Sequence, residues 1–371
     1  MIYLDNSATT RPFDCVADAV AKGLTESYFN VSSPYAEALR TEKKLVEAEK
    51  IIAASMNVKT NELIFTSGGT ESDNTALFCT PEKSEIIVSE YEHHAILSCI
   101  PALEKSGRKV IICPVDSSGK VSPETLGALV NENTSLVSIM HVNNEIGSIN
   151  DIKALSCAVK AKNPKTLFHS DGVQAYMHVC SDMKYLGIDL YSVSGHKIHG
   201  PKGIGVLYIR SGVPFKPYIF GGGQQENRRS GTVNVAGILG LAKAVETLGN
   251  DFPQKLNKVK AAYINALSTI PDTRLICPDS APNILSISFS GIKASSLQNA
   301  LENEVIIGKG SACTSRSSKI SHVLDAIGLS IQEAESTVRL SFGCFNTVEE
   351  AEKACELIKE KVAYLRKYKR K

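Results

Sequence analysis

The sequence lacks a strong net charge, a long apolar run and a secretion signal. Its formal net charge is +2, so overall charge gives no reason to expect nucleic acid or an anionic membrane as a partner. No apolar run approaches membrane-spanning length. The opening stretch MIYLDNSATT has neither the basic nor the apolar region of a signal peptide. We therefore expect a cytoplasmic protein without a membrane segment.

The ten cysteines include no C-x-x-C pair and no spacing typical of zinc ligands. Most lie among apolar residues, where a free cysteine behaves as a small hydrophobe, and this usage fits a reducing compartment. Cys313 is the exception. It lies in GKGSACTSRSS, a run of small and polar residues poorly suited to helix or strand. The run predicts a loop that presents a thiol.

The length of 371 residues suggests about two domains. Between about residues 60 and 245, short β-rich runs such as EIIVSE and DLYSVSG alternate with helical patterns such as DIKALSCAVKAK. This alternation predicts an α/β fold with a mainly parallel sheet, which we expect to have seven strands. After about residue 250 the pattern becomes a mixture of helices and strands. We expect a large α/β domain at 12–248 and a smaller α+β domain formed by 1–11 and 249–371.

Two glycine-containing turns are candidates for binding an anion and a carbonyl compound. In LIFTSGGTESDN, a strand runs through Gly69 and Thr70 into a helix, whose free N–H groups favour phosphate; a plain glycine turn is the alternative. In YSVSGHKIHGPKG, Ser194, His196 and Lys197 follow another strand. A lysine there can be a nucleophile toward a carbonyl group, although for a lysine taken alone a surface position in a loop is the favoured interpretation.

Further polar residues follow other expected strands. Asp171 and Gln174 lie in TLFHSDGVQ, where the carboxylate is either a helix cap or the partner of a protonated ring nitrogen. His93 in SEYEHHAI can stack on a flat ring or be a polar loop residue, and Asn144 follows in IMHVNNEIG. Strand ends of one open sheet line a common crevice. A phosphate cradle, a lysine, a carboxylate and a histidine gathered there are what pyridoxal 5'-phosphate requires.

The order of the motifs resembles that of a known family. FTSGGTESDN, EHHA, MHVNNEIG, SGHKIHGPKGIG, RSGT, GSACTS and RLSFG follow one another as in the NifS/IscS-type cysteine desulfurases. These enzymes form part of the class V aminotransferases, which have the fold-type I architecture of pyridoxal-phosphate-dependent transferases. The resemblance extends from near residue 3 to near residue 339. It implies a cysteine desulfurase that converts L-cysteine to L-alanine and leaves a persulfide on Cys313.

The resemblance also implies a role for each candidate residue. Lys197 would bind the cofactor covalently, Cys313 would accept sulfur from a mobile loop, and Arg339 would clamp the substrate carboxylate. Thr232 would reach the cofactor phosphate of a neighbouring subunit, which implies a homodimer. The remaining cofactor contacts would be Gly69, Thr70, His93, Asn144, Asp171, Gln174, Ser194 and His196, with Asn144 also near the substrate and His93 also catalytic. No metal is expected.

Two other functions remain open at this point. A selenocysteine lyase or cysteine-sulfinate desulfinase would keep the fold and change the substrate, although GSACTS is the motif of the group with a longer Cys loop. A non-catalytic regulatory protein of the same fold would have no use for Lys197, Asp171, His93 and Cys313. For an active desulfurase, the expected partner is a sulfur acceptor in iron–sulfur cluster assembly or tRNA thiolation, with no direct binding of nucleic acid.

Overall fold

The computed structural model describes residues 1–309 and 320–369, and within them the strands form two sheets. The larger sheet has seven strands in the order β2-β8-β7-β6-β5-β3-β4, and the smaller has five in the order β1-β11-β12-β10-β9. The larger sheet contains β2 (Leu63–Thr66), β3 (Glu85–Ser89), β4 (Lys109–Cys113), β5 (Thr134–Ser138), β6 (Leu167–Asp171), β7 (Leu190–Ser194) and β8 (Gly205–Ile209). The smaller contains β1 (Ile2–Leu4), β9 (Thr273–Leu275), β10 (Ile284–Phe289), β11 (Val305–Lys309) and β12 (Thr337–Ser341).

The seven-stranded sheet confirms the predicted α/β fold. Strands β4, β3, β5, β6 and β7 pair in parallel, whereas β8 is antiparallel to both β7 and β2. Every residue of β2, β7 and β8 is buried, which explains their almost unbroken apolar sequences. Each predicted β-rich run between residues 60 and 245 coincides with one of these strands.

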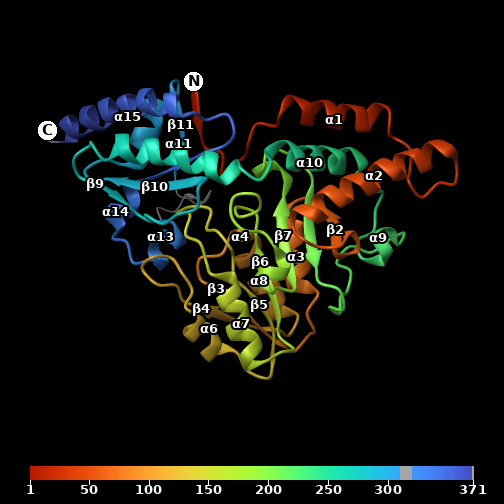
Figure 1. Cartoon of the computed structure of the whole chain (residues 1–371). Coiled ribbons are helices and arrows are strands. Elements are labelled where there is room, and N and C mark those ends of the chain that lie inside the picture. Colours follow the sequence, from red (N-terminus) through yellow and green to blue (C-terminus); the bar gives the residue numbers. More distant parts are fainter. Residues whose placement is uncertain (310–319, 370–371) are drawn as a thin grey trace.

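Helices surround both sheets (Figure 1). In the first half of the chain they are α1 (Asp14–Thr25), α2 (Ala36–Ser55), α3 (Gly69–Phe78), α4 (His94–Leu97), α5 (Ile100–Lys105), α6 (Pro123–Leu129), α7 (Ile152–Lys162) and α8 (Met183–Leu186), with the 3-10 turns η1 (Thr60–Glu62) and η2 (Gly195–Lys197). The rest are α9 (Gln224–Asn227), α10 (Val235–Leu248), α11 (Phe252–Leu267), α12 (Ala294–Leu301), α13 (His322–Ala326), α14 (Ile331–Glu335) and α15 (Val348–Lys369). Among the described residues, no helix combines the length and apolar character needed to cross a membrane.

The five-stranded sheet joins the two ends of the chain. β1 pairs in parallel with β11, more than 300 positions later, so the N-terminal segment lies among elements of the C-terminal part. Helix α15 packs against both α11 and α12, and Figure 1 shows α11 and α15 beside this sheet. The exact division of the chain into domains at residues 12 and 249 stays a prediction.

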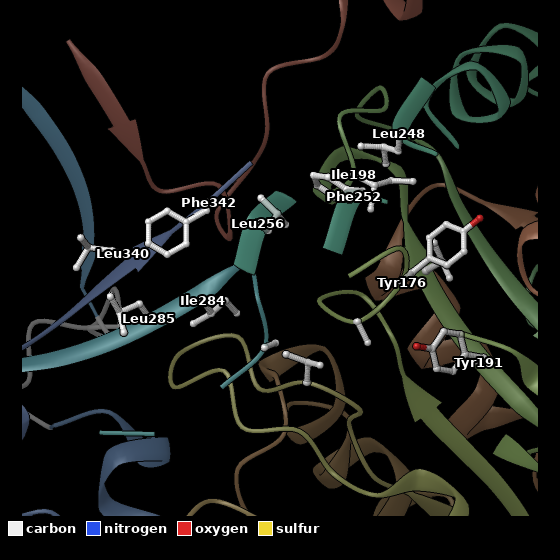
Figure 2. Close-up of a cluster of buried hydrophobic side chains, with 14 of the residues drawn as sticks. Tyr176, Tyr191, Ile198, Leu248, Phe252, Leu256, Ile284, Leu285, Leu340 and Phe342 are labelled. Carbon is white, nitrogen blue, oxygen red and sulfur yellow. The ribbon is translucent and has the colours of Figure 1, made fainter. Parts of the chain in front are cut away.

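One of three buried hydrophobic clusters among the described residues includes side chains from both sheets. Figure 2 shows Phe342, Leu340 and Ile284 at the smaller sheet, and Tyr176 and Tyr191 at the larger one. All five are buried members of this cluster. A continuous core restricts how the two sheets can move relative to each other. It therefore supports the strand ends that form the site.

We predict that Phe342→Ala lowers the free energy of unfolding by about 3–5 kcal/mol, because it leaves a cavity where a fully packed ring had been. The Phe342 ring is 1% exposed and lies 4.9 Å from the Tyr263 ring, centroid to centroid. Phe345→Ala is the matched control, since Phe345 is 43% exposed. Urea unfolding of both variants measures the difference, and equal losses would contradict this account of the core.

Candidate active site

Nine predicted site residues line one cavity of about 260 Å³ at the carboxyl ends of the large sheet's strands. They are Gly69, Thr70, His93, Asn144, Asp171, Gln174, Ser194, His196 and Lys197. Arg339 of β12 completes the wall from the smaller sheet. The strand ends converge because β3, β5, β6 and β7 run parallel, so their last residues reach the same edge. The structure thus brings together residues separated by up to 270 positions.

Lys197 extends from η2, directly after β7, toward the N-terminal segment. Its Nζ donates hydrogen bonds to the carbonyl oxygens of Ser7 at 2.6 Å and Ala8 at 2.9 Å. Burial and the nearby charge of Arg339 lower the pKa of Lys197 to about 8, against the opposing effect of Asp171 and Asp5. Near neutral pH a useful fraction of this amine is therefore unprotonated and able to react with a carbonyl group.

Asp171 ends β6 and is buried. Burial raises the pKa of its carboxyl group to about 6, although the Val173 N–H, which donates to Oδ1 at 2.8 Å, and the charge of Lys197 favour the ionised form. The following residue is glycine because any side chain at Gly172 would overlap the Tyr191 ring. The carboxylate therefore sits on a tightly packed turn that fixes its direction.

The two cavity histidines are neutral. Burial and the charge of Lys197 lower the pKa of His93 to about 4, and burial together with Lys197 and Lys202 does the same for His196. His93 caps α4 by accepting a hydrogen bond at Nδ1 from the Ala95 N–H. That bond fixes the ring's orientation and leaves Nε2 as its second polar atom.

The start of α3 fits a phosphate group. A Cβ atom at Gly69 would lie 2.6 Å from Cγ2 of Val173, so only glycine lets this helix end approach the turn after β6. The N–H groups of the first helical turn are free to bind an anion. Ser194 and His196 line the same cavity. Together with the depressed lysine pKa and the buried Asp171 carboxylate, this cradle fits pyridoxal phosphate.

Arg339 and Gln174 are held by contacts to distant parts of the chain. Arg339 donates from Nη1 to the backbone oxygen of Asn144 at 2.8 Å and from Nη2 to Asp5 at 2.6 Å. Gln174 donates from its amide to the Ser7 carbonyl at 2.9 Å. These contacts set the direction of both side chains at the cavity.

Two predicted residues are not in this cavity. Thr232 is exposed and lines a separate hollow of about 230 Å³ beside α1 and α10, so it does not contribute to the site of its own chain. Cys313 lies outside the described residues. The residues on either side of its segment are close to the cavity: Gly308 borders Arg339, and His322 hydrogen-bonds through Nε2 to the backbone oxygen of Glu92.

The structure adds cavity residues that the sequence reasoning missed. Ser7 and Ala8 come from the N-terminal segment, Met140 and Val173 from strand ends, and Asp73 from α3. Asp73 lies one helical turn beyond Thr70, a spacing that could have identified it. Within the described part of the chain its Oδ1 is buried without a hydrogen-bond partner, and burial raises the pKa of this carboxyl group well above its ordinary value.

Comparison with known proteins identifies clear relatives. The aminotransferase class-V family model matches residues 2–353. Cysteine desulfurase IscS of Clostridium botulinum is 40% identical, covering 96% of this chain and 93% of its own, and that of Methanosarcina thermophila is 41% identical, covering 98% and 93%. A solved structure described as a NifS-like protein superposes with a TM-score of 0.91 at 36% identity, covering 98% of this chain and all of its own. A structure described as SspA in complex with cysteine superposes at 0.83 with 30% identity, covering 94% and 100%.

We predict that Arg339→Gln raises the pKa of Lys197, because a neighbouring positive charge disfavours the protonated amine. With the cofactor removed, the rate at which pyridoxal phosphate recombines with the protein depends on the fraction of Lys197 whose amine is neutral. This rate should reach half of its maximum near pH 8 in the unmodified protein and at a higher pH in the variant. Stopped-flow absorbance between pH 6 and 10 measures this shift. Arg40→Gln, which removes an exposed charge, is the control; a shift there, or none in Arg339→Gln, would contradict the assigned cause.

Proposed function

The chain belongs to the class V aminotransferase family and is a pyridoxal-phosphate-dependent cysteine desulfurase; we propose that the cavity described above is where sulfur leaves L-cysteine. The observation that carries this proposal is the meeting of Lys197, Asp171, the start of α3 and Arg339 around one cavity. Each supplies a different interaction that an amino-acid substrate and this cofactor require.

In this proposal, the residues that line the cavity would hold the cofactor. The start of α3, with Gly69, Thr70, Ser194 and His196, would bind its phosphate, Asp171 would pair with its ring nitrogen, and His93 would stack on its ring. Gln174 would contact the ring oxygen, and Lys197 would bind the cofactor covalently. When bound, pyridoxal phosphate supplies an electron sink next to the substrate amine. The buried Asp171 carboxylate would favour the protonated ring nitrogen by offering it an anionic partner.

The residues of the chain then orient the substrate and move its protons. Arg339 binds the carboxylate of L-cysteine through its planar fork, with Asn144 beside it. Lys197, as a free and unprotonated amine, would be the base that removes the proton from Cα. Its lowered pKa suits this task, because a base works best when its pKa is near the working pH.

Cys313 completes the reaction as the sulfur acceptor. Its thiolate attacks the substrate sulfur, a new S–S bond forms, and the bond between sulfur and Cβ breaks with its electron pair remaining on the carbon skeleton. Protonation of that skeleton yields L-alanine, and the sulfur remains on Cys313 as a persulfide. The approach of both flanking segments to the cavity, at Gly308 and at His322, supports this role.

We predict that Cys313→Ser abolishes the release of sulfide from L-cysteine in the presence of a thiol reductant, lowering the rate at least about 100-fold, as expected when a nucleophile is lost. The variant should keep the cofactor's absorption band and its spectral response to L-cysteine. Cys157→Ser is the matched control because Cys157 is exposed and is not among the residues that line the cavity. Unchanged sulfide release by Cys313→Ser would refute the role of Cys313.

We further propose that the active unit is a homodimer in which Thr232 reaches the phosphate site of the partner. Its exposure and its exclusion from the cavity of its own chain support this arrangement. We predict that mixed dimers of Lys197→Ala and Thr232→Val chains contain one site with both defects and one with neither. They should recover up to about half of the full activity per dimer, whereas each homodimer is impaired. Sedimentation velocity checks the assembly, and absence of recovery in mixed dimers would contradict it.

The sulfur acceptor is proposed to be a protein of iron–sulfur cluster assembly or tRNA thiolation, and the location to be the cytoplasm. All nine described cysteines are unpaired, which supports a reducing compartment. In the sequence, small residues stand on both sides of Cys313, which suits a persulfide there to transfer to a second protein.

A further inference from the structure

The ion pair between Asp5 and Arg339 is a structural feature that the reaction outlined above does not use. Nη2 of Arg339 lies 2.6 Å from Oδ1 of Asp5, and the two side chains are 10% and 22% exposed. Because water is largely excluded from this pair, its geometry is held more firmly than that of a surface ion pair. Asp5 directly follows β1, so the residue that holds Arg339 comes from the opposite end of the chain.

The pair extends across the edge of the five-stranded sheet. Arg339 on β12 is the register partner of Gly308 on β11, and Leu4 on β1 pairs with Ile307. The guanidinium therefore crosses β11 above Gly308 to reach the residue that follows Leu4. A Cβ atom at position 308 would lie 2.6 Å from Oδ1 of Asp5 and 2.9 Å from both Nε and Nη2 of Arg339. Only glycine leaves room for this crossing.

The hydrogen bonds that Arg339 already makes determine which of its N–H groups can still bind a ligand. Nη1 donates to the Asn144 backbone oxygen, and Nη2 donates to Asp5. Nε is buried and has no hydrogen-bond partner among the described residues. Leaving a charged donor buried and unpaired costs free energy, and Arg339 borders the cavity. The two anchors thus fix the plane of the guanidinium. Each Nη carries a second N–H, and these two N–H groups are left for an incoming ligand.

We propose that Asp5 is a positioning residue: it orients the guanidinium of Arg339 across Gly308 so that the fork meets the carboxylate of the substrate. This inference rests on the proposed role of Arg339 in binding that carboxylate. The orientation of the guanidinium depends on the oxygen of Asp5, because this oxygen accepts the hydrogen bond that holds Nη2 in place. Residue 308 must lack a side chain, because a Cβ atom there would fill the space through which the guanidinium crosses.

The test compares two ligands that differ only in a carboxylate. L-Alanine and ethylamine share an amine and a methyl group, and both are titrated into the holoenzyme while the absorption band of the cofactor is followed. Asp5→Ala and Gly308→Ala should weaken the binding of L-alanine about tenfold or more, as expected for a lost hydrogen bond to a charged group. The affinity for ethylamine should stay within about twofold.

Two further variants define the role of residue 5 and of the glycine. Asp5→Asn keeps an oxygen that accepts from Nη2, so its affinity for L-alanine should remain within about threefold of the unmodified enzyme. Gly127→Ala is the control for Gly308→Ala, because an added Cβ at Gly127 would make only ordinary contacts of 3.9–4.0 Å. A merely structural role of Asp5 would weaken L-alanine and ethylamine equally, and that result would overturn the proposal.

Arg339→Gln separates this inference from the function on which it rests. If Arg339 binds the carboxylate, that variant loses the preference for L-alanine over ethylamine. Loss of the preference in Arg339→Gln but not in Asp5→Ala or Gly308→Ala would refute the role of Asp5 and leave the proposed function intact. An unchanged preference in Arg339→Gln itself would refute the carboxylate-binding role of Arg339.

Discussion

The site depends on one contact, in which the N-terminal segment lies against the turn that carries Lys197. The lysine amine donates to the carbonyls of Ser7 and Ala8, and the backbone N–H of Thr10 donates to the His196 oxygen. Gln174 donates to the same Ser7 carbonyl. A donor that is withdrawn from water and left without a hydrogen-bond partner destabilises the folded protein. The segment therefore holds the reactive lysine and neighbouring cavity residues in place together.

The same segment links the two sheets. Immediately before Ser7, the chain passes through Asp5, which pairs with Arg339, and through β1, which pairs with β11. A displacement of the N-terminal segment would thus move the lysine and the arginine together. The hydrophobic cluster that includes side chains from both sheets opposes such movement (Figure 2). The arrangement preserves the distance between the reacting amine and the carboxylate site, and orientation of this kind is a large part of catalysis.

Burial and neighbouring charges together set the protonation state of each ionisable group in the cavity. Arg339 lowers the pKa of Lys197, while Asp171 and Asp5 oppose that effect. Burial keeps His93 and His196 neutral, so that they do not add positive charge beside the lysine. Asp73, whose raised pKa favours the neutral acid, adds little negative charge. A phosphate and a substrate carboxylate would meet a site whose positive charge is concentrated at the lysine, the arginine and the start of α3.

Local sequence patterns predict the strands of the large sheet and most of the residues at their ends. The reason is local: continuous apolar runs identify buried strands, and a polar residue directly after such a run must lie at the sheet edge. Gly69, Asp171 and Lys197 were identifiable on that basis. The resemblance to a family added Arg339, which no local pattern connects to the other three.

The distant segments that complete the cavity are known from the folded chain alone. Asp5, Ser7 and Ala8 reach it because β1 pairs with β11, and no short-range signal encodes a pairing across some 300 residues. The lowered pKa of Lys197 likewise depends on burial and on the position of Arg339, which are properties of the folded chain. Sequence patterns report on neighbours along the chain, whereas desolvation and charge depend on neighbours in space.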